Sequence, residues 1–283
     1  MIKVAILNYP QALKSAIYGL EEMFLLANAI TEDEQVLDER QGQNHFAKPL
    51  VQNTPLFNVC HICYQGEEES ELGLQQFDAV IIPPSLGSFF YLEQSNPEKS
   101  ALNLWLIRQH KNGAILTSAC AGAFILANTG LLDNRTVTTH WQLSQKLKVY
   151  CPKAKVEEDK ILINEKDVIT AGGLMAWLDL GLELVSVLTC PSLMRQLGKQ
   201  LVVDTGHREQ AYYQVFKPNK HTDSSVLTCQ HYIQMHYQKS IKIAELTELT
   251  HLTERTLLRR FQAALSLSPS EYIQNTRIQK ACD

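Results

Sequence analysis

The fold is decided by one stretch of sequence, which reads Ala114-Ile115-Leu116-Thr117-Ser118-Ala119-Cys120-Ala121-Gly122-Ala123-Phe124. Its apolar first half predicts a buried strand, and its small residues predict a tight turn that opens a helix. A strand that turns sharply into a helix exposes the side chain at the turn at the carboxyl edge of a sheet. Ligands usually bind at that edge in α/β proteins. The stretch therefore predicts an α/β domain with Cys120 at a candidate site.

Strand-like runs alternate with helical stretches on both sides of this turn. Besides 114–117, we predict strands at residues 2–7, 77–82, 137–139, 161–163 and 168–170. Helices are predicted at residues 16–29, 102–110 and 179–188. Residues 31–48 have the composition of a polar insert, and residues 57–63 that of a hairpin-like stretch. The alternation is typical of a parallel sheet covered by helices.

Polar and aromatic residues interrupt this periodicity near Pro218-Asn219-Lys220. We therefore predict an α/β domain over 1–207, a linker over 208–224 and an all-α segment over 225–283. In the last segment Pro269 falls where a new helix begins, and Ser268 is its predicted cap. From Pro218 onward eight lysines and arginines face six acidic residues, although the net charge of the whole chain is -4. A mildly basic tail fits contact with nucleic acid.

The composition is that of an ordinary soluble protein, with 45% hydrophobic residues among 283. This length suits one large domain and a smaller one. The apolar stretch at residues 2–7 is far shorter than a signal-peptide core or a membrane span, so we expect a cytoplasmic protein with no membrane partner.

The seven cysteines are an odd number spread over the whole chain, and a reducing compartment keeps such thiols free. Cys60 and Cys63 have the C-x-x-C spacing of a redox or zinc half-site, but no second pair of ligands follows at a suitable distance. We therefore expect no disulfide framework, no metal ion and no cofactor.

A helix-turn-helix pattern lies in the last segment. Residues 243–249 form a short amphipathic helix, Thr250-His251-Leu252 breaks it, and Thr253 is placed to cap the next helix. In that second helix three apolar residues recur every fourth position and are predicted to pack inward, namely Leu257, Phe261 and Leu265. The opposite face carries Arg255, Leu258, Arg259 and Gln262. Two arginines one turn apart suit the major groove of DNA, although a solvated surface helix also carries charges.

The string Ala244-Glu245-Leu246, Leu252-Thr253, Arg255-Thr256-Leu257, Arg259, Phe261, Leu267-Ser268-Pro269 and Tyr272-Ile273 resembles the first half of an AraC-type DNA-binding domain. The resemblance implies DNA contacts by Thr253, Arg255, Thr256, Leu258 and Arg259. His251 stands where that family usually has glycine in the turn. Such domains carry two helix-turn-helix units, and the second is absent here, so we expect a truncated member whose DNA binding is weak and salt-sensitive.

The cysteine turn, residues 119–122, also carries a resemblance. Backbone amides at the start of a helix are expected to lower the pKa of Cys120 and favour its thiolate, although a buried core cysteine is the simpler interpretation. Cys120-Ala121-Gly122 followed by Val137-Thr138-Thr139-His140 resembles the DJ-1/PfpI superfamily. Gly130-Leu131-Leu132 and Thr139-His140-Trp141 resemble its GlxA-like branch, which is fused to AraC-type domains. This resemblance implies a flavodoxin-like sheet, a pocket in which Cys120 and His140 meet, and a homodimer.

Two departures from the family pattern argue against catalysis. Pro84 and Ser85 stand where the family has two glycines, and proline has no N–H to offer an oxyanion. Ala16 replaces an acidic residue that polarises the cysteine in the enzymes of the family. Glu22, further along the same predicted helix, is the candidate substitute for that carboxylate.

We therefore assign no catalytic residue and predict a ligand pocket lined by Cys120, Ala121, His140, Trp141 and Ser85. A small effector is expected there, and a nitrogenous one suits the ring face of Trp141. The sequence predicts a transcriptional regulator that binds DNA and a small-molecule effector. The alternative is a cysteine-dependent hydrolase or glyoxalase-like enzyme.

Overall fold

The computed structural model describes residues 1–41, 55–64, 72–87, 100–204, 209–210 and 221–282. The chain divides into two compact units, Met1–Tyr213 and Gln214–Asp283. Of the predicted linker, residues 208 and 211–220 lie outside the described residues, and so do 42–48 of the predicted insert.

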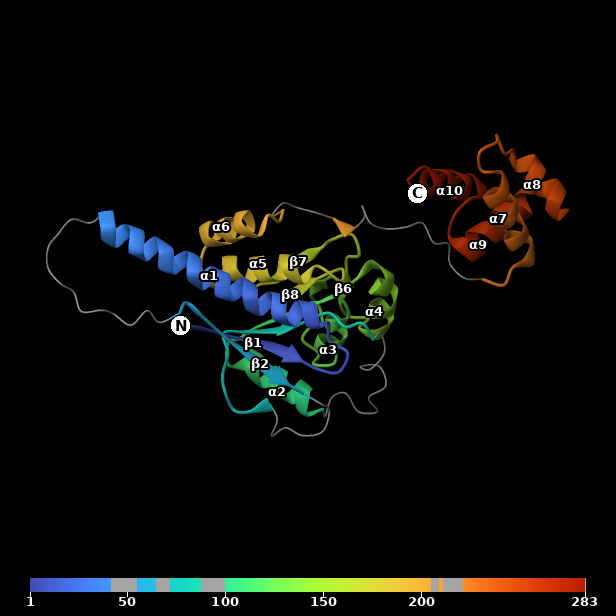
Figure 1. Ribbon diagram of the computed structural model, residues 1–283. Helices are drawn as coiled ribbons and strands as arrows, with labels where there is room; N and C mark the ends of the chain where they lie inside the picture. Colours follow the sequence, from blue (N-terminus) through green and yellow to red (C-terminus); the bar gives the residue numbers. More distant parts are fainter. Residues whose placement is uncertain (42–54, 65–71, 88–99, 205–208, 211–220, 283) are drawn as a thin grey trace. The chain divides into compact units, whose positions relative to one another are not determined.

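The first unit is built on a six-stranded sheet (Figure 1). In spatial order its strands are β2 (Phe57–Cys63), β1 (Ile2–Asn8), β3 (Ala79–Ile82), β4 (Ile115–Ala119), β8 (Val168–Ala171) and β7 (Leu162–Asn164). All neighbouring pairs are parallel except β7 with β8. The four central strands are almost wholly buried, which explains their continuous apolar sequences. The parallel α/β fold class predicted from the sequence is confirmed.

The hairpin predicted around residues 57–63 is wrong. β2 lies parallel to β1, with Ile2 opposite Phe57 and Asn8 opposite Cys63. A parallel partner needs a crossover connection, and that connection contains helix α1 (Lys14–Gln41). β2 is an edge strand, so its half-exposed residues give a mixed pattern that resembles a hairpin strand.

The helices and short strands of the first unit complete its layers. After α1 they are α2 (Ala101–Lys111), η3 (Cys120–Gly122), α3 (Ala123–Ala127), β5 (Thr136–Val137), η4 (Trp141–Leu143), α4 (Ser144–Tyr150), β6 (Lys155–Val156), α5 (Trp177–Leu188) and α6 (Pro191–Leu201). α1, α5 and α6 pack against one another on one face of the sheet, and α2 lies on the other face (Figure 1). β5 and β6 form a separate two-stranded sheet.

α1 is longer than the sequence analysis predicted. The predicted inward positions Ile17, Leu20, Phe24 and Ala27 are all buried. The helix continues to Gln41 because residues 31–41 contain neither glycine nor proline and are rich in helix-compatible Glu, Gln, Leu and Arg. The polar residues 31–41 therefore belong to a helix and not to an insert.

Two glycines let α1 and α5 approach closely. A Cβ atom on Gly19 would lie 2.5 Å from the Trp177 ring, and one on Gly181 would lie 2.6 Å from the sulfur of Met23. Each helix therefore supplies a glycine beneath a large side chain of the other helix, and both contacts are made on the buried side of α1.

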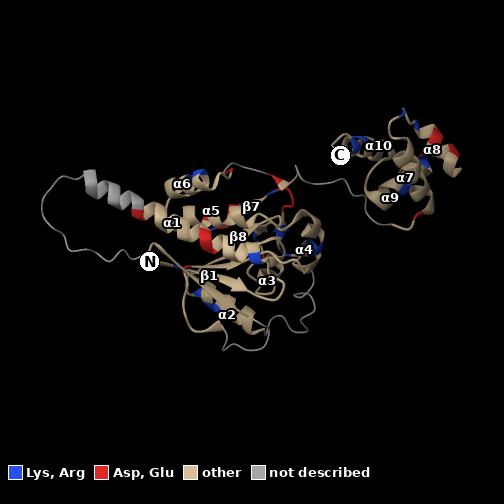
Figure 2. Ribbon diagram, in the orientation of Figure 1, with Lys and Arg blue, Asp and Glu red and all other residues tan. Residues whose placement is uncertain are grey.

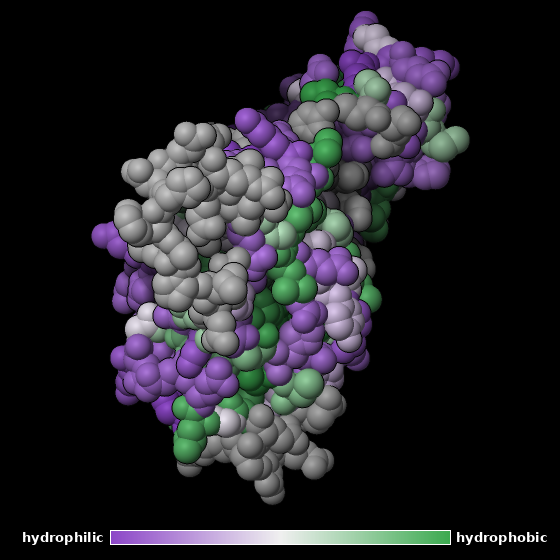
Figure 3. Space-filling view, turned by 60° about the vertical axis from the view of Figure 1, so that its left-hand side comes forward, coloured by the Kyte–Doolittle hydropathy of each residue, from purple (hydrophilic) through white to green (hydrophobic). Residues whose placement is uncertain are grey.

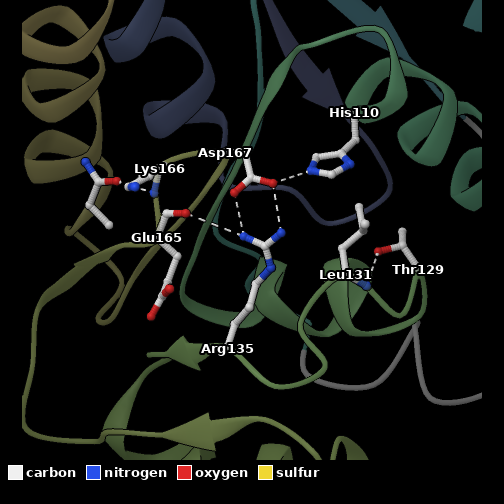
Figure 4. Close-up of polar contacts among 8 residues, drawn as sticks. His110, Thr129, Leu131, Arg135, Glu165, Lys166 and Asp167 are labelled. Atoms are coloured by element: carbon white, nitrogen blue, oxygen red, sulfur yellow. Dashed lines mark hydrogen bonds and ion pairs between the residues drawn. The ribbon is translucent and has the colours of Figure 1, made fainter.

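A charged cluster closes the amino edge of the sheet (Figure 4). Arg135 donates from both terminal nitrogens to Asp167, at 2.6 and 2.8 Å, and His110 Nε2 lies 2.6 Å from the same carboxylate. The Arg135 guanidinium holds the pKa of Asp167 well below its usual range. His110 lies in the last turn of α2 and Asp167 directly precedes β8, so the cluster joins two layers at the edge opposite Cys120.

The second unit is all helical in its described residues. Its helices are α7 (Ser224–His236), α8 (Ile243–Thr250), α9 (Glu254–Leu265) and α10 (Pro269–Cys282). Its core consists of Val226, Cys229, Ile233, Leu246, Leu257, Phe261, Leu265, Tyr272 and Ile273. The Ser268 hydroxyl accepts a hydrogen bond from the Glu271 N–H at 3.2 Å, as predicted for the cap of α10. No helix in the described parts of either unit is long and apolar enough to span a membrane.

Candidate functional site

The cysteine turn lies at the carboxyl end of β4, as the sequence predicted. Cys120 has a φ of 54°, in the left-handed region that a side chain rarely adopts, and it begins the 3-10 turn Cys120–Gly122. A Cβ atom on Gly122 would lie 2.8 Å from the Ile82 carbonyl oxygen, so only glycine lets the turn pack this closely against the end of β3. The sequence thus places Cys120 at the sheet edge by a backbone that is strained and tightly packed.

The predicted Cys120 thiolate is wrong. The residue is only 5% exposed, and burial raises the pKa of its thiol to about 11. A backbone hydrogen bond with Ala121 lowers the pKa but does not offset the burial. Desolvation of the charged form thus outweighs the stabilisation of the thiolate by the backbone amide. Cys120 is therefore a neutral thiol at pH 7.

His140 and Trp141 lie in the segment next to Cys120. The Thr139 hydroxyl donates to the Cys120 carbonyl oxygen at 2.7 Å, which ties this segment to the cysteine turn. His140 is half-buried, burial lowers its pKa, and its ring stacks on that of Trp141 with centroids 5.6 Å apart. Its Nδ1 accepts from the Gln142 N–H at 3.1 Å. Among the described residues no hydrogen bond joins His140 to Cys120, so the pair does not form a nucleophile and base.

Ser85 is buried and its side chain is already engaged. Its Oγ lies 3.2 Å from the Gln11 carbonyl oxygen and accepts from the Gly87 N–H at 3.1 Å. The preceding Pro84 carbonyl accepts from the Leu13 N–H at 2.7 Å. Pro84 and Ser85, which stand where the resembled family has two glycines, are thus hydrogen-bonded to the loop after β1, and Pro84 has no N–H to donate.

Glu22 does not replace the acidic residue that the resembled enzymes have at position 16. Ala16 is fully buried, whereas Glu22 is exposed on the solvent side of α1. Glu22 is therefore not a substitute, because its side chain points away from the sheet.

Tyr9 is a residue near this segment that the sequence analysis did not predict. It is buried, and its hydroxyl donates to the Pro83 carbonyl oxygen at 2.5 Å.

A second missed residue, Gln210, contacts the same segment. It is buried, and its Oε1 accepts from the Trp141 N–H at 3.0 Å. Its Nε2 donates to the carbonyl oxygens of Thr139, at 2.9 Å, and Lys160, at 2.8 Å. No sequence signal singles out a glutamine in a polar region predicted to be a linker. Its role becomes visible only when the sheet brings residues seventy positions apart together.

The candidate DNA-binding face is the outer side of α9. Arg255, Leu258, Arg259 and Gln262 are exposed, while Leu257, Phe261 and Leu265 are buried, as the spacing predicted. The Thr253 hydroxyl accepts from the Thr256 N–H at 3.4 Å and lies 2.9 Å from the Thr256 hydroxyl. Thr253 thus caps α9, and both threonines lie at its first turn.

His251 forms the turn between α8 and α9. Its φ is 53°, the conformation for which the resembled family uses glycine. His251 therefore adopts the left-handed backbone conformation that glycine accommodates without strain.

The C-x-x-C spacing does not make a site. Cys60 and Cys63 are three positions apart on β2, so their side chains lie on opposite faces of the strand. Within the described residues no group of three or more His, Cys, Asp or Glu side chains is placed to hold a metal ion.

These features agree with a comparison to known proteins. Residues 62–187 match the model of the DJ-1/PfpI family. The DJ-1/PfpI match covers the strands β3 and β4, the cysteine turn and the His140–Trp141 segment, so the resemblance drawn from the sequence is confirmed for this domain.

Several curated relatives are named as regulators. The HTH-type transcriptional regulator CdhR of Pseudomonas aeruginosa is 29% identical over 183 residues, which cover 64% of this chain and 54% of CdhR. The HTH-type transcriptional regulator GbdR of the same species is 24% identical over 181 residues, covering 62% of this chain and 48% of GbdR. The HTH-type transcriptional regulator GlxA of Rhizobium meliloti is 34% identical over 83 residues, covering 29% of this chain and 25% of GlxA.

The chain spans about half the length of CdhR and GbdR. The GlxA match is too short to place the chain in a GlxA-like branch. The chain is therefore related to HTH-type transcriptional regulators.

Solved structures show the same fold. An AraC family transcriptional regulator from Pseudomonas putida has a TM-score of 0.51 at 14% identity, over 71% of this chain and 100% of that one. A ThiJ/PfpI family protein from Pseudomonas syringae has a TM-score of 0.51 at 12% identity, over 98% of this chain and 90% of that one. At such low identity these likenesses support the fold and carry no further argument.

Proposed function

We propose that this chain is a sequence-specific DNA-binding transcriptional regulator whose α/β unit binds a small, nitrogenous effector. The observation that carries the proposal is the outer face of α9. Within the described residues, neither Arg255 nor Arg259 has an ion-pair or hydrogen-bond partner, and both are exposed.

The other two arginines of the second unit serve its internal structure. Arg260 donates to the Ser225 hydroxyl at 2.9 Å and pairs with Asp223 at 3.4 Å. Arg277 donates to the backbone carbonyls of Tyr237 and Lys239 at 2.9 and 2.5 Å. The unit therefore separates structural arginines from two that are presented to solvent one helical turn apart.

The position of these two arginines favours a DNA-binding role over the alternative that they are ordinary charges on a solvated helix face. They project from the first two turns of a capped helix that follows a tight turn, the geometry in which a recognition helix enters the major groove. α9 contains one acidic residue, Glu254, which begins the helix one position before Arg255, whereas Glu245 and Glu248 lie on α8 (Figure 2). Bidentate contacts from arginine to guanine are the commonest specific contacts in that groove.

The cysteine turn supports ligand binding more than turnover. Burial raises the pKa of the Cys120 thiol to about 11, so the neutral thiol is the dominant form at pH 7. Pro84 offers no N–H and Ala16 no carboxylate, so the means of activating a thiol and of holding an oxyanion are both missing. The stacked rings of His140 and Trp141 are partly exposed beside this turn, where they suit a nitrogenous ligand.

We also propose that the regulator is a homodimer. Tyr18 and Leu25 lie two turns apart on α1 and are more than half exposed, at 53% and 56%. The face in Figure 3 shows hydrophobic side chains in a band between hydrophilic ones. A dimer would present two copies of α9 to a two-fold symmetric site. Light scattering during size-exclusion chromatography tests this state directly.

The DNA-binding proposal is tested by selection from a random pool of duplexes. The wild-type chain is expected to enrich a defined sequence, and the double variant Arg255→Ala with Arg259→Ala is expected to lose that enrichment. Lys239→Ala removes one exposed charge from the same unit and serves as a control that should still select the sequence. No enrichment by the wild type, or unchanged selection by the double variant, would refute the proposal.

A further inference from the structure

Gln210 fills a polar niche that is built for its carboxamide. The amide oxygen accepts one N–H, that of Trp141, at 3.0 Å. The amide nitrogen lies 2.9 Å from the Thr139 carbonyl oxygen, 2.8 Å from that of Lys160 and 3.2 Å from the Thr138 hydroxyl. The residue is 3% exposed, so these contacts are made away from solvent.

Glycine at position 172 makes room for this niche. A Cβ atom there would lie 1.9 Å from Gln210 Nε2 and 2.7 Å from the Thr139 carbonyl oxygen. Gly172 directly follows β8, and its own N–H donates to the Ile161 carbonyl at 2.6 Å. The cavity for the amide is therefore part of the sheet edge and not a chance gap under a surface loop.

The arrangement of donors and acceptors selects one chemical class. Two carbonyl oxygens and a hydroxyl oxygen receive N–H groups, and a single backbone N–H needs an acceptor. The two N–H groups of a primary carboxamide reach the two carbonyl oxygens, one N–H is shared with the more distant Thr138 hydroxyl at 3.2 Å, and the amide oxygen accepts the Trp141 N–H. A carboxylate would place an oxygen against two carbonyl oxygens, and an ammonium ion would leave the Trp141 N–H unpaired, which is costly when buried.

Outside this amide, the described contacts of the segment are modest. Glu209 pairs with Lys160 at 2.7 Å, but both side chains are about half exposed, and exposed pairs contribute little. The Gln210 N–H also donates to the Asp159 carbonyl at 2.6 Å. Among the contacts of the described residues, the carboxamide is thus the principal buried contact of Gln210, which lies eleven positions before His221, the first described residue of the second unit.

We propose that the niche formed by Thr138, Thr139, Trp141, Lys160 and Gly172 is a receptor for primary carboxamides, and that Gln210 is its built-in occupant. A small carboxamide ligand competes with Gln210 for the niche. Its binding releases the segment that leads to the second unit. The receptor itself stands on the geometry of the first unit, whereas its use as a signal to the DNA-binding unit rests on the proposed function.

Chemical rescue tests the receptor in the full chain. All three tryptophans lie in the first unit, so tryptophan fluorescence reports the melting of that unit. Gln210→Ala is expected to lower its Tm by roughly 3–8 °C, and propionamide is expected to restore most of the loss. N,N-dimethylpropionamide has no N–H and should not restore it.

Two further variants keep this test specific. Gly172→Ala combined with Gln210→Ala fills the niche and should melt low without rescue by propionamide. Gln145→Ala changes an exposed glutamine on α4 and should melt like the wild type, with no effect of propionamide. Equal rescue by both amides, rescue of the filled niche, or no rescue of Gln210→Ala would each overturn the receptor.

Hydrogen exchange tests the displacement in the wild type. Propionamide at about 0.5 M is in excess over the millimolar effective concentration of a tethered group. At this concentration the backbone amide proton of Gln210 should exchange at least several-fold faster than without propionamide. The dimethyl amide at the same concentration should leave the exchange rate unchanged. Equal rates with and without propionamide would overturn the displacement. The proposed function would fail separately, in the duplex selection, since neither test uses DNA.

Discussion

Arg259 and Arg260 are adjacent in the sequence, yet the structure gives them opposite roles. Arg259 is exposed on the outer face of α9 and has no partner in the described part of the chain. Arg260 reaches back to the start of α7, where it contacts Asp223 and Ser225. We therefore predict that Arg259→Ala impairs DNA binding at unchanged stability, whereas Arg260→Ala destabilises the second unit.

The contacts set the size of each effect. The Arg260→Ala variant loses one partly exposed, charge-assisted hydrogen bond to the Ser225 hydroxyl, worth about 1 kcal/mol after solvent screening, and one partly exposed ion pair, worth about 0.2–1 kcal/mol. The free energy of opening of α7 and α9 should thus fall by about 1–2 kcal/mol. Loss of one bidentate contact from arginine to guanine costs about 1–3 kcal/mol, which corresponds to roughly 5- to 150-fold in affinity. Surface substitutions without partners change stability by less than about 0.5 kcal/mol.

Two measurements on the full chain separate these outcomes. Hydrogen exchange of peptides from α7 and α9 gives the opening free energy of the second unit. Titration of the selected duplex gives the affinity, and a scrambled duplex gives the non-specific reference. If Arg259→Ala raised the exchange rates as much as Arg260→Ala does, the separation of structural and presented arginines would be wrong. Equal affinity of Arg259→Ala and the wild type for the selected duplex would refute its role in binding DNA.

Three further predictions concern other parts of the molecule. Asp167→Asn should destabilise the first unit by about 1 kcal/mol at pH 7. Because the pKa of Asp167 is lowered in the folded state, the difference in urea midpoint between the variant and the wild type should narrow as the pH falls from about 5 to 2. A difference that stays constant over this pH range would contradict the ion pair with Arg135. Iodoacetamide at neutral pH should alkylate the exposed Cys190 well before Cys120, as peptide mass spectrometry would show, and the reverse order would contradict a raised Cys120 pKa. His251→Gly should stabilise the second unit by about 1 kcal/mol, since glycine adopts a φ of 53° without strain. Hydrogen exchange of α8 and α9 measures this change, and slower exchange in the wild type than in the variant would contradict the prediction.

The sequence predicted those elements whose signal is local. The central strands are continuous apolar runs and were found with small errors at their ends, and the inward faces of α1 and α9 were found because they follow helical spacing. The wrong assignments concern residues whose environment is set by distant parts of the chain. β2 has a mixed pattern because it lies at the sheet edge, and the end of α1 depends on the absence of a helix breaker rather than on any apolar stripe.

The candidate site was predictable in position but not in chemistry. The sequence placed Cys120 at the end of β4 because a strand, a glycine and a helix follow one another there. It did not reveal the raised pKa of Cys120, which depends on how deeply the surrounding chain buries the thiol. Gln210 was missed for the same reason, because four of its partners are contributed by residues 138–141 and 160, which only the folded sheet brings to it.

The paired glycines between α1 and α5 restrict how these two helices can move past each other. A slide of either helix by one turn would drive the Trp177 ring or the Met23 side chain onto a residue that has a Cβ atom, since Gly19 and Gly181 are the positions that accommodate them. Close packing at both glycines therefore opposes sliding of α1 along α5, and a displacement of one helix along its axis requires the other to follow.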